Sequence, residues 1–179
     1  LAGESRVLEW LDRLREGYRI PAVLNSGAFD NYPGCGRQRT YIRNQTDDPA
    51  AFRRSGPQTR PSLDQKGLVG AGDPIHGLVA NAKAGHLLLT NGPFLEASLR
   101  SSNGDVVAFP GDSIRAESGD VTIDVRVQCS NQYDIDRIQV LIKGRRNAVL
   151  DFRKDSHADF FQTGVVKFQR EIPLNLRKD

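Results

Sequence analysis

The chain has 179 residues, a length that suits one compact domain or a small appendage joined to one. Hydrophobic residues make up 38% and charged residues 26%, which excludes a disordered or fibrous chain and predicts a soluble globular protein. The net charge is only +3 with arginines in both halves, and no apolar run approaches the roughly 20 residues of a membrane span, so we expect neither a nucleic-acid nor a membrane partner.

The N-terminal residues predict a helix followed by a strand. Apolar residues three and four positions apart indicate an amphipathic helix over residues 4–16, ended by Gly17: Val7, Leu8, Leu11 and Leu14. The apolar run 18–24 then predicts a short strand buried on both faces, which is αβ-type organisation. The chain starts at Leu1 without a recognisable signal peptide, which indicates a fragment.

The next 43 residues or so are rich in turn-forming and polar residues. Between 31 and 73 only Tyr41 and Ile42 resemble a strand, so this stretch is predicted to be a long loop with a functional surface or a linker role. Residues 74–84 have helical spacing, with Asp73 as a possible cap and Gly85 as the stop.

From residue 86 onward the hydrophobic period is two. Strands are predicted at 87–89, 94–99, 121–127, 138–142, 148–152 and 165–172. Several short strands with regular turn signals are typical of an antiparallel β-sandwich of the immunoglobulin type. We therefore expect a mainly β chain, with a sandwich at 86–179 preceded by a small α/β part at 1–85.

Three stretches match motifs that occur together in one family. A Gly-x-Arg-x-Pro element at 17–21 leads to Asn25-Ser26-Gly27-Ala28-Phe29, an Arg-Thr-Tyr element begins at Arg39, and Thr-Asn-Gly-Pro surrounds Asn91. Together they resemble the C-terminal end of PHP-type metal-dependent hydrolases, specifically the CehA/McbA-like branch. The resemblance implies that 1–85 corresponds to the end of a distorted (β/α) barrel, and that a β-sandwich follows.

The metal motif of that family is degenerate in this sequence. Gly27 and Phe29 stand where the family pattern has aspartate and histidine ligands, and neither side chain offers a donor to a divalent cation. A shift of one residue would bring in Asp30, but it would also turn that side chain to the other face of a strand. We expect no catalytic residue, metal or cofactor in this chain, although the resembled family uses a divalent metal.

The function expected from the resemblance is that of a non-catalytic accessory region with a structural, interaction or ligand-binding role. One alternative is that the chain belongs to an active metal-dependent phosphoesterase or hydrolase whose ligands lie upstream of Leu1. Another is a carbohydrate-binding sandwich.

The apolar faces of residues 4–26 predict a partner, either a second copy of the chain or a missing upstream barrel domain.

Other residues are candidates for binding or chemistry. Asp30 is one possible ligand-binding residue. The arginines of the long loop, including Arg37, Arg39 and Arg43, form a basic surface that either attracts an anionic ligand or is only solvated. Cys35 or Ser26 could serve as a nucleophile with a histidine, but no supporting motif accompanies them. Cys35 and Cys129 are two independent thiols or a disulfide. The acidic loops near 134–136 and 155–159 are solvated turns or weak calcium sites.

Overall fold

The computed structural model describes residues 2–26, 38–44, 46–52, 74–101, 107–116 and 118–176. Antiparallel strands dominate, as predicted, and helices are few. The helices are α1 (Ala2–Arg15), α2 (Pro74–Ala84), η1 (Pro49–Phe52) and η2 (Ala158–Phe160). The strands are β1 (Arg39–Ile42), β2 (Leu87–Thr90), β3 (Phe94–Ser101), β4 (Val107–Ala108), β5 (Asp120–Gln128), β6 (Arg137–Ile142), β7 (Arg145–Arg153) and β8 (Val166–Asn175).

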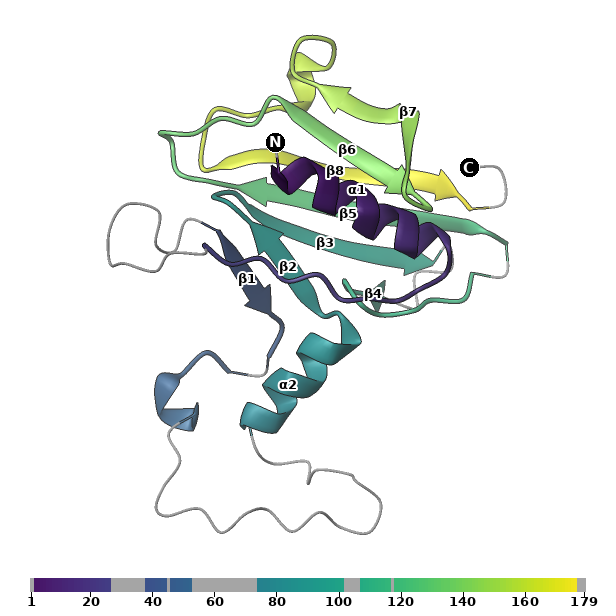
Figure 1. The fold of residues 1–179 in the computed structure, drawn as a ribbon. Helices are drawn as coiled ribbons and strands as arrows, with labels where there is room; N and C mark the ends of the chain where they lie inside the picture. Colours follow the sequence, from purple (N-terminus) through teal and green to yellow (C-terminus); the bar gives the residue numbers. More distant parts are fainter. Residues whose placement is uncertain are drawn as a thin grey trace, which may run out of the picture.

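The largest sheet has the strand order β4-β3-β5-β8 (Figure 1). Its central strand β5 alternates apolar and polar residues, so one face of the sheet is apolar and the other carries charges. Antiparallel pairing places Val125 opposite Ala97 and Val121 opposite Leu174, which keeps the apolar residues of neighbouring strands on the same face. Pro173 lies in β8, where an edge strand tolerates a residue that lacks an N–H donor.

The β6–β7 hairpin packs on the apolar face of this sheet and closes the core. Phe168 on β8 is fully buried, and Leu150 on β7 packs against the same cluster. The other buried members of the cluster come from β5, β8 and the segment before β8: Val121, Val125, Val127, Phe161, Ile172 and Leu174. Burying each of these side chains contributes on the order of 2 kcal/mol, so this two-layer core is the main source of stability.

The smaller β1–β2 sheet pairs Tyr41 with Leu88 in antiparallel register. It therefore joins a strand from the long predicted loop to the first strand after α2, and Figure 1 shows it below the large sheet with α2 beyond it. The sequence-based predictions of α1, of α2 and of a strand at Tyr41–Ile42 are confirmed. The six strands predicted after residue 86 are confirmed as well.

The prediction of a buried strand at 18–24 is wrong. This segment contains no regular secondary structure, and Tyr18, Ile20 and Val23 are 57%, 48% and 73% exposed. Its polar backbone atoms bond to side chains instead of to a neighbouring strand: Trp10 Nε1 donates to the Ile20 carbonyl (2.7 Å), and Thr40 Oγ1 bonds both the N–H and the carbonyl of Leu24 (2.8 Å each). Apolar content alone does not distinguish a buried strand from such an extended segment.

Within the described residues, no helix is long and apolar enough to cross a membrane.

Candidate functional site

A groove of about 840 Å³ lies between the β1–β2 sheet and strands β3, β5 and β8 of the large sheet. Its volume is within the range of pockets that hold small ligands. On the side of the small sheet the lining includes Tyr41 of β1, Arg43 directly after β1 and His86 directly before β2, while Phe94 and Arg126 line it from the large sheet. Phe109, in the loop after β4, also contributes to the lining.

Three aromatic rings in the groove are partly exposed. Tyr41 is 41% exposed, Phe94 38% and Phe109 39%. The rings of Tyr41 and Phe94 meet edge to face, with centroids 5.2 Å apart and planes at 86°. This contact couples the small sheet to the large one, and it leaves apolar ring surface available to a ligand.

One end of the groove is a hydrogen-bonded cluster around His86. The ring nitrogens of His86 lie 3.0 Å from Asn81 Oδ1 and 2.9 Å from Asp112 Oδ1. Asp112 also accepts the backbone N–H of Phe109 (2.9 Å). The guanidinium of Arg43 lies 3.7 Å from Asp112 and stacks 4.0 Å above the centroid of the Phe109 ring. The cluster thus fixes Arg43 and Phe109 at the rim of the groove.

The charges of this cluster act on Asp112. The backbone N–H of Phe109, and then the charge and hydrogen bond of His86 and the charge of Arg43, hold the pKa of Asp112 below its usual value, although partial burial opposes the shift. Gly111, at φ +93°, makes the arrangement possible, because a Cβ there would lie 2.5 Å from the backbone of Gly85 and from the His86 ring. The loop can approach α2 and β2 this closely only with glycine at this position.

Ion pairs cover the polar face of the large sheet beside the groove. Arg100 binds Asp124 through two bonds of 2.7 and 2.9 Å and also binds Glu171 at 2.7 Å. Arg126 and Gln128 both donate to Glu96, at 3.2 and 3.0 Å. Each of these three carboxylates therefore has an arginine partner within the chain, although Asp124 and Glu171 share one guanidinium. Arg126 Nε is buried and has no partner among the described residues, so this guanidinium keeps unused donor capacity.

The structure brings together part of the predicted ligand-binding set. Arg39 lies on the same face of β1 as Tyr41 and donates to the Tyr41 hydroxyl at 3.4 Å, and Arg43 directly follows the strand. Arg43 lines the groove. The other two members of the set, Asp30 and Arg37, lie outside the described residues, as do the motif positions Gly27 and Phe29.

The remaining motif positions have a structural setting. Asn91 is exposed in the turn between β2 and β3, where Thr90 Oγ1 accepts the N–H of Gly92 (2.9 Å) and donates to the carbonyl of Pro93. Asn25 and Ser26 end the extended segment that lies along β1. None of these three residues lines the groove.

Other candidates from the sequence are placed apart from the groove. Cys129 is a free, buried cysteine, whereas Cys35 lies outside the described residues. His157 packs against Phe152 and Phe160 in the loop after β7. The described residues include no group of three or more His, Cys, Asp or Glu side chains arranged to hold a metal ion.

Sequence reasoning missed most of the groove. Phe94, Phe109 and His86 all line the groove, and none of them is among the binding residues expected from the sequence. No local signal connects His86 with Asp112, because they meet only through the fold. Comparison of the chain with protein-family models, curated proteins and solved structures finds no match.

Proposed function

We propose that this chain is a non-catalytic, ligand-binding accessory region of a PHP-like metallohydrolase homologue, with an immunoglobulin-like sandwich from residue 86 onward. The observation that carries the ligand-binding role is the groove of about 840 Å³, in which three partly exposed rings lie beside the guanidinium of Arg43. Exposed rings that converge on one concavity are typical of binding sites.

The identity of two residues supports the non-catalytic part of the proposal. Gly27 has no side-chain donor and Phe29 has no lone pair, so the motif that resembles the hydrolase family lacks two of its ligands. The ring nitrogens of His86 are also both engaged. His86 bonds Asn81 and Asp112, and within the described part of the chain no nucleophilic side chain is hydrogen-bonded to its ring.

The lining indicates the class of ligand. Tyr41, Phe94 and Phe109 offer ring faces and edges to an apolar, preferably aromatic body. Arg43, at the rim of the groove, offers N–H donors to an acceptor or anionic group on the same molecule. An aromatic anion satisfies both requirements.

The proposal is tested with an anilinonaphthalene sulfonate dye, which combines an aromatic body with an anionic group. We expect saturable binding followed by dye fluorescence, and a Phe94→Ser/Tyr41→Ala variant should bind about tenfold more weakly, since two lost ring contacts contribute on the order of 1 kcal/mol or more.

The matched control is Val149→Ser, which removes an apolar side chain that is 82% exposed and outside the groove. This variant should bind the dye as the wild type does. Binding that is unsaturable, or that weakens equally in both variants, would mean that the groove is not the binding site.

A carbohydrate is the second candidate, because the polar side chains of Ser98 and Gln169 line the same groove as the rings. A glycan array with the wild type and the Phe94→Ser/Tyr41→Ala variant separates the two ligand classes. Sugar binding that depends on these rings would favour the carbohydrate.

A further inference from the structure

The β6–β7 hairpin carries opposite charges at its two ends. A two-residue turn, Lys143-Gly144, joins the strands, and Arg145 pairs with Ile142 directly after it. We call Lys143, Arg145 and Arg146 the turn end; all three are exposed cations. No carboxylate lies between Arg137 and Asp151 in the sequence, so the turn end carries three positive charges and no acidic neighbour of its own hairpin.

Helix α1 approaches the turn end but does not neutralise it. Asp12 and Glu16 line a polar pocket together with the turn residues. However, Asp12 is already paired with Arg15 (2.7 Å) and Glu16 with Arg13 (3.0 Å). Among the described residues Lys143 and Arg145 form no ion pair, and Arg146 acts only through its charge on Asp151. The turn end therefore keeps uncompensated positive charge.

The opposite end of the hairpin is acidic. Carboxylates precede β6 and follow β7, and we call this group the base: Asp134, Asp136, Asp155 and Asp159. Asp134 pairs with Lys154, while Asp155 and Asp159 are exposed and form no ion pair within the described part of the chain. Cations also lie at this end, namely Arg137, Arg153, Lys154 and Lys167, whose charge acts on Asp134. The negative charge that stays without an ion pair within the described residues is therefore that of the exposed Asp155 and Asp159.

The charges without ion pairs at the far ends of the hairpin, such as Arg145 and Asp155, are too far apart to neutralise each other within one molecule. Strand β7 has nine residues, so the ends are separated by about 27 Å at roughly 3.3 Å per residue. Charges in water at physiological salt are screened over about 8 Å. A second hairpin that runs in the opposite direction would place each turn end beside a base.

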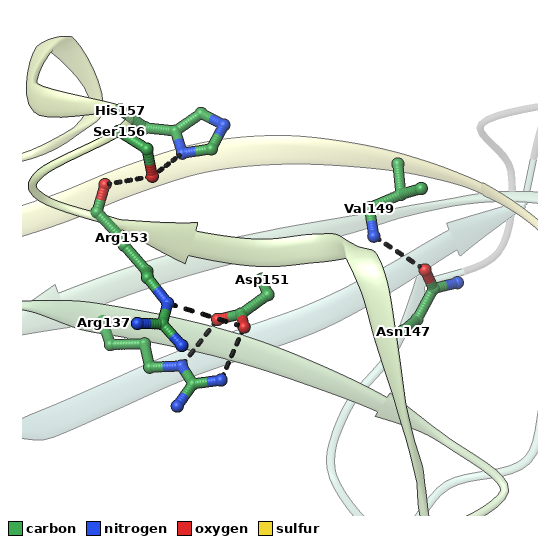
Figure 2. Close-up of polar contacts among 7 residues, drawn as sticks. All are labelled: Arg137, Asn147, Val149, Asp151, Arg153, Ser156 and His157. Carbon is green, nitrogen blue, oxygen red and sulfur yellow. Dashed lines mark hydrogen bonds and ion pairs between the residues drawn. The ribbon is translucent and has the colours of Figure 1, made fainter.

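Two exposed apolar residues lie on the outer face of the hairpin between these ends, beside the Arg137–Asp151 ion pair. Val149 is 82% exposed and Leu141 is 41% exposed, while their neighbours Leu150, Val140 and Ile142 face the core. The Asn147 side chain accepts the Val149 N–H (3.0 Å) at an irregularity in the strand (Figure 2). Such an irregularity opposes the addition of another strand at this edge, so the face itself is the available surface.

We propose that two copies of this chain associate antiparallel about a two-fold axis through the outer faces of their β6–β7 hairpins. Each turn end then meets the base of the partner, and Val149 and Leu141 of both copies are covered at the centre. A two-fold arrangement makes both charged contacts equivalent. The partner is a second copy because the chain itself carries the complementary charge, in the same element and on the opposite side of the exposed apolar residues.

The test is a charge-swap experiment read by light scattering after size-exclusion chromatography. At about 100 μM protein and low ionic strength, the wild type should have twice the mass of one chain. Arg145→Glu/Arg146→Glu and Asp155→Lys/Asp159→Lys should each be monomeric, because each places like charges in contact. An equimolar mixture of the two variants should form a heterodimer, because every contact is then between opposite charges.

Lys83→Glu/Arg115→Glu is the matched control, since it changes the net charge by the same amount as Arg145→Glu/Arg146→Glu at exposed positions outside the hairpin. It should remain dimeric, and added salt should raise the wild-type dissociation constant at least about tenfold. Circular dichroism verifies that each variant is folded.

Three results would overturn the proposal. The first is a monomeric wild type at this concentration, and the second is a mixture of swapped variants that stays monomeric. The third is a dimer that survives both swaps but dissociates in Val7→Ser/Leu8→Ser, which would place the interface on α1, where these two residues are 54% and 60% exposed.

Discussion

At the scale of single residues, Asp151 shows how the outer face of the hairpin is organised. Its carboxylate accepts two bonds from Arg137, at 2.6 and 2.5 Å, and Arg153 lies 3.8 Å away on the other side (Figure 2). The hydrogen bonds and charge of Arg137, with the charges of Arg153 and Arg146, lower the pKa of Asp151 despite partial desolvation. The carboxylate holds two strands together through one bidentate contact.

This contact makes stability depend on pH. A carboxyl whose pKa is lower in the folded chain stabilises the fold above its unfolded pKa of about 4, and loses that contribution as pH falls through the folded pKa. Asp151→Asn should therefore unfold at lower urea concentration than the wild type at pH 7. The difference between the two proteins should shrink as the pH is lowered below 4. A difference that stays constant with pH would show that the ionised carboxylate is not responsible.

At the scale of elements, the β6–β7 turn has a backbone that its first residue does not favour. Lys143 and Gly144 have φ angles of 51° and 71°, the conformation of the two-residue turns that suit hairpins. Glycine is also required at 144 for packing, because a Cβ there would lie 2.9 Å from the Leu11 carbonyl oxygen of α1. Lysine at 143 adopts a left-handed conformation for which asparagine is better suited.

Substitution at Lys143 tests this conformation. Lys143→Asn should stabilise the chain by about 0.5 kcal/mol, whereas the β-branched Lys143→Val should destabilise it by about 1–2 kcal/mol. Urea unfolding at high salt measures both, since screening removes the effect of the lost charge on association. Equal effects of asparagine and valine would contradict the turn conformation.

At the scale of the whole molecule, the core and the groove draw on different parts of the chain. All the buried hydrophobic residues that the structure describes lie between Ala108 and Leu174. The groove, in contrast, needs β1 from the N-terminal part, which pairs with β2 and contacts Phe94 through Tyr41. Stability and ligand binding should therefore be separable.

A fragment spanning residues 84–179 tests that separation. It retains every buried hydrophobic residue of the core and should unfold cooperatively in urea, because β3, β5, β8 and the β6–β7 hairpin supply both layers. It lacks Tyr41 and Arg43, so it should not bind the anilinonaphthalene sulfonate dye saturably. A fragment that fails to unfold cooperatively would show that the N-terminal part is needed for the core.

The sequence by itself determined the elements whose signal is local. The alternation at 121–127 predicts β5, and the spacing and glycine stop of 74–84 predict α2, because side-chain period and end signals depend on neighbouring residues only. Arg39 and Arg43 could be proposed as binding residues from the sequence alone, because arginines gather in the long loop. The absence of donors at Gly27 and Phe29 is likewise a property of residue type.

The tertiary structure decided which distant residues meet. Phe94, Phe109 and His86 line the groove, and Asp112 bonds His86, only because β2, β3 and the loop after β4 converge there, and no spacing along the chain encodes such convergence. The same holds for residues 18–24, whose apolar character was visible but whose exposure was not. Local patterns specify which side chains can be buried together, whereas packing among elements specifies which of them are buried.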